Sequence, residues 1–162
     1  MGPIEKVNIR PGVSVLSVLR HMNYAPWFAL AEFVDNAIQS YKANHKSLSG
    51  LDGDEILKVE ISYDREADAL VIRDSAAGIS ADDYERAFRP AQVPTDRSGL
   101  SEFGMGMKSA ACWFSPRWEV KTKALGEPVN RTIKFDIDNI VNDQIEELEV
   151  TIQPEEKDAH YT

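Results

Sequence analysis

The sequence has one cysteine, three histidines and no long apolar run, and each shortage excludes a class of protein. A single cysteine, Cys112, excludes an intramolecular disulfide and a cysteine-ligated zinc cluster. The apolar segments fall short of the roughly 18 residues that suggest a membrane span, and the first residues form no signal sequence. Basic residues are also scarce, with 18 Lys and Arg against 27 Asp and Glu, which argues against direct nucleic-acid binding. We therefore expect a cytoplasmic chain with neither a membrane nor a nucleic acid as its direct partner.

A length of 162 residues predicts one domain, and 43% hydrophobic residues suffice for an ordinary globular core. Polar composition predicts a loop or frayed helix end at 42–54, a loop at 89–104 and a solvated face at 136–149. Apolar periodicity predicts helices over Val13–Met22, Trp27–Tyr41, a segment that opens at Ser80, and Met105–Phe114. Alternation predicts strands over Ile56–Tyr63, Ala69–Asp74, Trp118–Ala124, Arg131–Ile137 and Ile145–Ile152.

This order of elements predicts an α+β fold, with helices on one face of a mixed, mostly antiparallel sheet. The sequence stops at Thr162 directly after a predicted strand, with no terminal helix. We therefore expect residues 1–162 to form a single domain that is the N-terminal fragment of a longer protein.

The first candidate for chemistry is the segment Ala29–Ile38, which places Glu32 and Asn36 one helical turn apart. The amide oxygen of Asn36 can coordinate a hard cation such as Mg²⁺, and the carboxylate of Glu32 can accept a proton from a nearby water. The same spacing also fits a solvated helix face that carries two polar residues.

The second candidate is the run Asp74-Ser75-Ala76-Ala77-Gly78 at the end of an apolar strand. Small side chains let a flat ligand approach the backbone, and Asp74 can accept a hydrogen bond from an exocyclic amine. A strand-to-helix turn in which Asp74 bonds its own backbone explains the same residues without a ligand.

The third candidate is the glycine-containing segment 99–110, in which Gly104 and Gly106 precede a predicted helix. Free backbone N–H groups at the start of a helix bind anions, and Lys108 adds a positive charge in the first turn. The segment is not a Walker loop, because Met105 follows Gly104 where that motif requires Lys.

In this order, the three segments resemble the motifs of the ATPase superfamily of gyrase, heat-shock chaperone, histidine kinase and MutL proteins (GHKL). Its motifs E-x-x-D-N, D-x-G-x-G and G-x-x-G-x-G correspond to Glu32–Asn36, Asp74–Gly78 and the run that contains Gly104 and Gly106. The resemblance spans Val13–Thr162 and implies a two-layer α/β sandwich of the Bergerat type. The motif wording is closest to MORC-like and chaperone-like members, and a Glu at position 32 favours the ATPase branch over the histidine kinases.

The resemblance implies a role for each matching residue, with ATP or ADP and Mg²⁺ as ligands. Glu32 would be the general base for the attacking water, and Asn36 would bind Mg²⁺. Asp74 would recognise the adenine amino group beneath a lid formed by residues 90–103. ATP would close this lid and drive self-dimerisation of the full-length protein. The other expected nucleotide-binding residues are Gly78, Ile79, Phe103, Gly104, Gly106, Met107, Lys108, Ser109 and Thr162.

Two departures from the family pattern leave other functions open. Ser75 and Ala76 replace the usual Asn and first Gly of the second motif, and an alanine does not adopt positive φ cheaply. A degenerate nucleotide sensor without turnover is therefore a second hypothesis, and a histidine kinase catalytic domain is a third. Many relatives also supply a phosphate-sensing Lys from a following domain, so we expect slow turnover from residues 1–162 alone.

Overall fold

The computed structural model describes residues 12–52, 56–90 and 105–162, and these form an α+β fold, as the sequence predicts. Helices and strands follow one another in the expected order, with one additional short helix before the last strand. The elements are α1 (Val15–Leu19), α2 (Pro26–Asp52), β1 (Val59–Asp64), β2 (Ala69–Asp74), α3 (Ala81–Phe88), α4 (Gly106–Phe114), β3 (Arg117–Lys123), β4 (Val129–Asp136), α5 (Ile137–Asn142) and β5 (Val150–Pro154).

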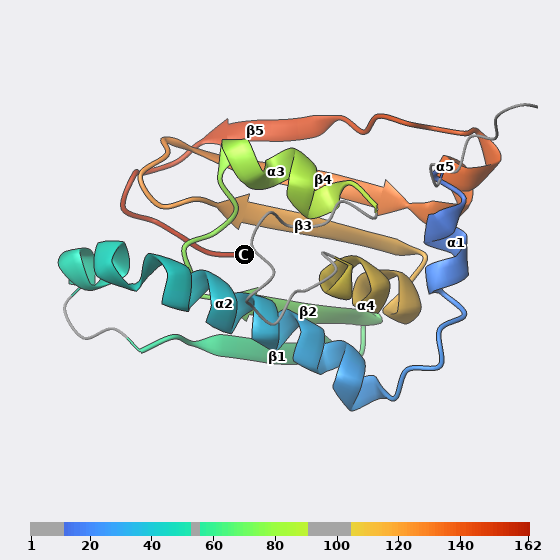
Figure 1. Cartoon of the computed structure of the whole chain (residues 1–162), viewed down its shortest axis with the longest axis horizontal. Helices are drawn as coiled ribbons and strands as arrows, with labels where there is room; N and C mark the ends of the chain where they lie inside the picture. Colours follow the sequence, from blue (N-terminus) through green and yellow to red (C-terminus); the bar gives the residue numbers. More distant parts are fainter. Residues whose placement is uncertain (1–11, 53–55, 91–104) are drawn as a thin grey trace, which may run out of the picture.

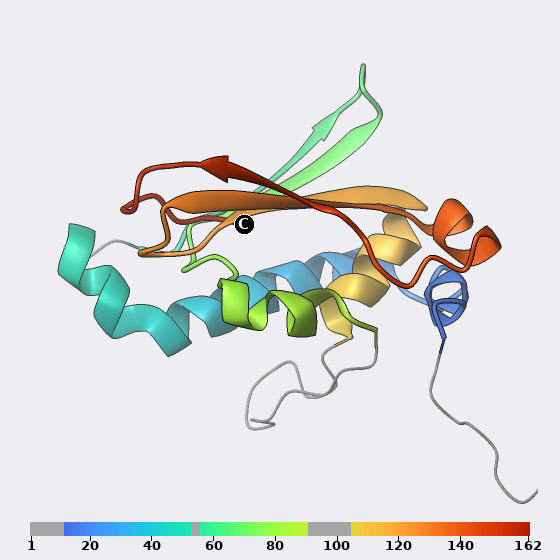
Figure 2. The ribbon, with the colours of Figure 1, turned by 90° about the horizontal axis from the view of Figure 1, so that it is seen from above.

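The strands form two antiparallel sheets, and the helices cover one side of the larger sheet (Figure 1). Strands β1 and β2 pair from Val59 opposite Asp74 to Asp64 opposite Ala69, which makes them a hairpin. Strand β4 lies between β3 and β5 in the second sheet. Figure 2 shows α2, α3 and α4 together on one side of this sheet, while the tip of the hairpin projects away from them. The predicted arrangement of helices on one face is therefore confirmed.

Residues Tyr161 and Thr162 join the two sheets. Tyr161 exchanges two backbone hydrogen bonds with Lys123 of β3, at 2.9 and 3.0 Å, and Thr162 exchanges two with Asp74 of β2, at 2.8 and 3.4 Å. In an extended segment, the backbone groups of successive residues point to opposite sides. Tyr161 and Thr162 therefore lie between β3 and β2 and run antiparallel to both strands. Strands β2 and β3 therefore run in the same direction on either side of it, which makes the combined sheet mixed.

The core lies between the three-stranded sheet and the helices. Phe135 of β4 stacks on Trp118 of β3 with ring centroids 3.8 Å apart, and it also contacts Phe88 of α3. Cys112 of α4 is 1% exposed in this core, as expected for a small buried residue. From Ile133 to Asp136, buried and exposed positions alternate along β4, so this half of the strand has one packed face and one open face.

The sequence predicts a loop or a frayed helix end at 42–54, and the structure instead continues α2 as a helix over residues 42–52. Polar side chains there bond the helix itself: the Asn44 amide donates to the Ser40 carbonyl at 2.9 Å, and the Ser49 hydroxyl donates to the His45 carbonyl. Leu48 is 5% exposed, so the extension also packs against the fold. Although α2 has 27 residues, neither it nor any other described helix is apolar enough to cross a bilayer.

The acidic residues of 136–149 are exposed, as expected for a solvated face, but the start of this segment also forms the short helix α5. The Asp136 carboxylate caps this helix by accepting a backbone N–H at 3.1 Å. Ile137 and Ile140 are 0% and 3% exposed and belong to the core. Strand β5 consequently starts at Val150, five residues later than alternation predicts.

The N-terminal part also differs from the prediction. Helix α1 covers only five residues of the predicted Val13–Met22. Pro26 is the first residue of α2, as its fixed φ predicts. Trp27 and Phe28 follow it and are 68% and 61% exposed, so they lie on the surface and not in the core.

Candidate functional site

Helix α2 presents the Glu32 carboxylate to the first turn of α4. An ideal Cβ built on Gly106, the first residue of α4, would lie 2.0 Å from Oε2 of Glu32. Only glycine therefore leaves room for the carboxylate in this position. The backbone N–H groups at the start of α4 make this helix end electropositive, which suits a nearby anion. The structure thus brings together one residue from the first predicted motif and one from the third.

Tyr24 lies in the segment before α2, and its ring packs edge-on to Trp113 of α4 with centroids 6.3 Å apart. Burial raises the pKa of Glu32, and the negative charge of Asp35 raises it further. A carboxylate with a raised pKa is a better proton acceptor near neutral pH than an ordinary solvated one.

Asn36 lies one turn after Glu32 on the same face of α2. Among the residues that the structure describes, no three His, Cys, Asp or Glu side chains are placed to hold a metal ion. Mg²⁺ bound with a nucleotide takes most of its ligands from phosphates and waters and only one or two from protein. A single amide oxygen from Asn36 fits that arrangement.

Strand β2 ends at Asp74, whose carboxylate turns back onto the following loop. One oxygen accepts the N–H of Ala76 at 2.9 Å, and burial raises the pKa of the carboxyl group. This bond belongs to the local turn that the sequence allows without a ligand. The backbone of Thr162 pairs with that of Asp74, so two residues that the sequence assigns to nucleotide binding lie side by side.

The residues that depart from the family pattern are accommodated in this loop. Ala76 has no positive φ, and within the loop that conformation belongs to Gly78, at φ 71°. The Ser75 hydroxyl accepts the N–H of Lys58 at 2.9 Å, and the His160 ring bonds the Ala76 carbonyl at 3.0 Å. The loop is therefore held at both of its altered positions.

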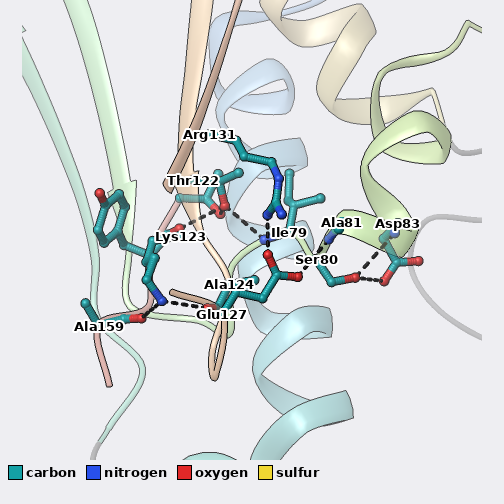
Figure 3. Close-up of polar contacts among 12 residues, drawn as sticks. Ile79, Ser80, Ala81, Asp83, Thr122, Lys123, Ala124, Glu127, Arg131 and Ala159 are labelled. Carbon is teal, nitrogen blue, oxygen red and sulfur yellow. Dashed lines mark hydrogen bonds and ion pairs between the residues drawn. The ribbon is translucent and has the colours of Figure 1, made fainter. Parts of the chain in front are cut away.

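Gly78 is required because β3 passes close to the loop. A Cβ there would lie 2.1 Å from the carbonyl oxygen of Lys123. The N–H of Ile79 donates to the Thr122 hydroxyl at 2.9 Å, and the same hydroxyl bonds that of Thr162 at 3.0 Å (Figure 3). Thr122 thus ties the loop after β2 to the segment that lies between the sheets.

Further polar contacts hold the surroundings of the loop, as Figure 3 shows. Glu127 accepts the N–H of Ala81 at 2.8 Å and forms an ion pair with Arg131, which anchors the start of α3. The Lys123 amine is fully buried and donates to the carbonyls of Ala124 and Ala159 at 2.9 and 3.0 Å. The loop therefore rests on a hydrogen-bonded frame built from β3, β4 and residues 159–162.

Lys108 is turned toward α3. Its side chain is buried, and its amine donates to the Ala87 carbonyl at 2.8 Å and to the Arg86 carbonyl at 3.5 Å. These carbonyls belong to the last turn of α3, where the helix dipole favours a cation. Burial, with a smaller effect from the charge of Arg86, lowers the pKa of Lys108 to about 8. The phosphate contact that the sequence suggests for Lys108 would require this side chain to leave α3.

The remaining predicted residues divide into two groups. Phe103, Gly104 and residues 91–103 of the expected lid lie outside the described residues. Ile79 and Met107 are partly buried and pack against the core, and Ser109 is 2% exposed.

A polar cavity of about 210 Å³ lies beside the second half of α2. It is lined by Asn44 and Ser47 of α2 and by Ala77 and Gly78 of the loop after β2. Asn44 lies about 18 Å beyond Glu32 along the helix axis, and Glu32 does not line this cavity.

Three residues of this arrangement were not predicted from the sequence. Tyr24 lies before α2, where no periodicity marks it, and Thr122 looks like any inward residue of a strand. His160 belongs to none of the three motifs. In each case the partner is distant along the chain, or belongs to a different element, so spacing gives no signal.

A sequence model of one protein family, described as histidine kinase-, DNA gyrase B- and HSP90-like ATPase, matches residues 24–162. The matched range begins at Tyr24 and includes Glu32, Asp74 and Gly106. It also includes every element of the fold except α1.

Proposed function

The chain belongs to the histidine kinase-, DNA gyrase B- and HSP90-like ATPases, and we propose that it binds ATP with Mg²⁺ and hydrolyses the terminal phosphate. The observation that carries this proposal is the Glu32 carboxylate held against Gly106 at the start of α4. A proton acceptor thereby lies next to a helix end that can bind phosphate through its N–H groups. The adenine ring would bind at the loop after β2, where Asp74 can accept a hydrogen bond from the adenine amino group.

In the proposed reaction, Glu32 removes a proton from the attacking water. The water oxygen forms a bond to the terminal phosphorus as the bond from that phosphorus to the ADP oxygen breaks. ADP and inorganic phosphate leave, and the proton rests first on Glu32. Asn36 would offer its amide oxygen to Mg²⁺, which reduces the charge on the phosphates. Backbone N–H groups at Gly106 and Met107 would bind phosphate oxygens.

The motif wording favours a MORC-like or chaperone-like member, and a cytoplasmic location accords with the composition. We propose that ATP closes residues 90–103 over the nucleotide and that the full-length protein then dimerises. Size-exclusion chromatography of the full-length protein with a non-hydrolysable ATP analogue would test this, with ADP as the comparison. A monomer under both conditions would contradict the dimerisation.

Nucleotide binding is tested first by thermal unfolding with Mg²⁺ and ATP, ADP or GTP. A ligand at about 100 times its dissociation constant stabilises a protein by about 2.7 kcal/mol, which is roughly 5–10 °C for a domain of this size. We expect a shift with ATP and ADP but not with GTP. Asp74→Asn should reduce the ATP affinity by about tenfold or more, because it removes a charged acceptor. Asp64→Asn is the matched control, since Asp64 also accepts a backbone N–H two residues on, at 2.9 Å, but lies in the hairpin turn.

Hydrolysis is tested by phosphate release from Glu32→Gln. We expect ATP binding to remain and turnover to fall by about 100-fold or more, the usual range for loss of a general base. Glu119→Gln is the control, because Glu119 is an exposed residue of β3 that pairs with Lys134. Equal turnover in wild type and Glu32→Gln would exclude Glu32 as the base.

A nucleotide sensor without turnover is the second candidate function. The observation that favours it is the engagement of Lys108 with the carbonyls of α3, which directs this cation away from Glu32. A sensor would show the thermal shift with ATP and ADP, but no phosphate release above that of Glu32→Gln, even in the full-length protein.

A further inference from the structure

We propose that Thr122 determines the base specificity of the nucleotide site: its hydroxyl fixes the proton of the Thr162 hydroxyl, so that the side chains of Asp74 and Thr162 offer only hydrogen-bond acceptors to a base. This inference rests on the proposed nucleotide binding and adds to it a residue from outside the three motifs.

The Thr122 hydroxyl is fully buried and makes three hydrogen bonds in the described structure. Its oxygen lies 2.9 Å from the backbone nitrogen of Ile79 (Figure 3) and 3.0 Å from both the Tyr161 carbonyl oxygen and the Thr162 hydroxyl oxygen. A threonine hydroxyl has one proton to donate and two lone pairs that accept. The three contacts therefore use its whole hydrogen-bonding capacity.

Only one arrangement of protons satisfies all three contacts. The N–H of Ile79 can only donate, so it takes one lone pair of the Thr122 oxygen. The carbonyl of Tyr161 can only accept, so it takes the Thr122 proton. The Thr162 hydroxyl must then donate to the second lone pair of Thr122, because no other proton is left for that contact. Thr162 consequently has only lone pairs left for another partner.

Thr162 lies directly opposite Asp74 in the sheet. The two residues exchange both backbone hydrogen bonds, at 2.8 and 3.4 Å, so their side chains project from the same face. An ionised carboxylate only accepts, and one oxygen of Asp74 already accepts the Ala76 N–H. A water bound to both side chains would donate its two protons to them and would present only lone pairs to a base. The pair therefore has the same polarity with or without a bridging water.

A pair of acceptors selects a purine by the group on carbon 6 of its ring. Adenine carries an amino group there, which donates hydrogen bonds, whereas guanine and hypoxanthine carry a carbonyl oxygen, which accepts them. That carbonyl would face lone pairs and would remain unpaired, which costs affinity. Without the Thr122 hydroxyl, the Thr162 hydroxyl could rotate and donate its proton to the carbonyl. Thr122 therefore maintains the discrimination without contacting the base.

The test is Thr122→Val, which removes the hydroxyl and keeps the branched shape of the side chain. Dissociation constants for ATP, GTP and inosine triphosphate are measured with Mg²⁺ by displacement of a fluorescent ATP analogue. We expect the preference for ATP over the other two nucleotides to fall by about tenfold, as for one hydrogen bond gained by the carbonyl. Thr122→Ser retains the hydroxyl and should keep the wild-type preference. Thr151→Val is the matched control, because Thr151 is an exposed residue of β5.

Thr162→Val provides a second variant, which leaves Thr122 in place and decides the question even if Thr122→Val does not fold. It should weaken ATP binding several-fold, because an acceptor is lost, and it should not weaken the binding of GTP or inosine triphosphate. An unchanged preference in Thr122→Val, including an equal loss of affinity for all three nucleotides, would overturn the proposal. Equal weakening of ATP and GTP in Thr162→Val would also overturn it, since the Thr162 hydroxyl would then be free to donate.

The two levels of the proposal fail in different ways. A wild-type protein with no affinity for any of the three nucleotides would overturn the proposed function and this inference together. A wild-type protein that binds ATP and inosine triphosphate equally well would overturn this inference alone.

Discussion

Replacement of Gly106 by alanine is expected to reduce ATP hydrolysis without unfolding the protein. The new Cβ would lie 2.0 Å from Oε2 and 2.9 Å from Cδ of Glu32, whereas ordinary contacts begin at 3.4 Å. The carboxylate must therefore retreat by about 1.4 Å, or the two helices must separate. Rotation of the side chain is the easier response, because the clash is with the far end of a flexible chain and not with backbone.

The two consequences of Gly106→Ala differ greatly in size. Alanine is favoured over glycine in a helix by about 1 kcal/mol, and an off-rotamer Glu32 costs a similar amount. The free energy of unfolding should therefore change by less than about 1 kcal/mol. A displacement of about 1 Å in a catalytic constellation, in contrast, reduces the rate by roughly 100-fold.

Phosphate release and urea unfolding of the same preparation measure both quantities. Gly12→Ala is the control, because a Cβ at Gly12 approaches no closer than 3.9 Å, to the Ser14 hydroxyl. In a Glu32→Ala background, the substitution Gly106→Ala should become stabilising, because the clashing carboxylate is absent and only the helix preference remains.

Unchanged turnover in Gly106→Ala would refute the link between this contact and catalysis. An equal loss of several kcal/mol with and without Glu32 would show that backbone, and not the carboxylate, absorbs the added methyl group.

Other expectations follow from the same structure. Gly78→Ala should destabilise by more than about 2 kcal/mol in urea unfolding, since it combines positive φ with a contact of 2.1 Å to backbone, whereas Gly126→Ala, at φ 78° with open space, should lose only about 1 kcal/mol. The folded-state pKa of Lys108 is about 8 and the unfolded value is 10.5, so the unfolded state binds more protons between these values. The free energy of unfolding should rise across that pH window by on the order of 3 kcal/mol, and Lys108→Met should lose the rise. Cys112 is 1% exposed with a pKa raised to about 11 by burial, so a thiol reagent at pH 8 should label it only after unfolding.

Features that depend on neighbouring residues were predicted well from the sequence. The start of α3 is one example: the sequence predicts a helix that opens at Ser80, and the Ser80 hydroxyl accepts the Asp83 N–H, three residues on, at 3.3 Å. The end of β2 at Asp74 is another, because an apolar run gives way there to small residues. In both cases the interacting groups belong to one turn of chain.

Features that depend on packing between elements were missed. The polar residues Asn44 and Ser49 suggested a loop, yet their side chains bond the helix carbonyls of the preceding turn, and burial of Leu48 favours the helix. The approach of Glu32 to Gly106 and the rotation of Lys108 toward α3 require knowledge of how α2, α3 and α4 lie together. Periodicity identifies the face of a helix but not its partner.

The segment at 159–162 also determines when the site can exist during synthesis. The hairpin of β1 and β2 closes over a short turn, but the bond between His160 and Ala76 joins residues that are 84 positions apart. Contacts over such separations form late in folding, because the chain entropy of closing the loop must be lost first. The chain leaves the ribosome N-terminus first. The motifs Glu32–Asn36 and Asp74–Gly78 would therefore be partly folded while Asp74 still lacks its neighbour Thr162. Affinity for the adenine end of a nucleotide should therefore be the last property that the domain acquires, which makes it a direct readout of completed folding.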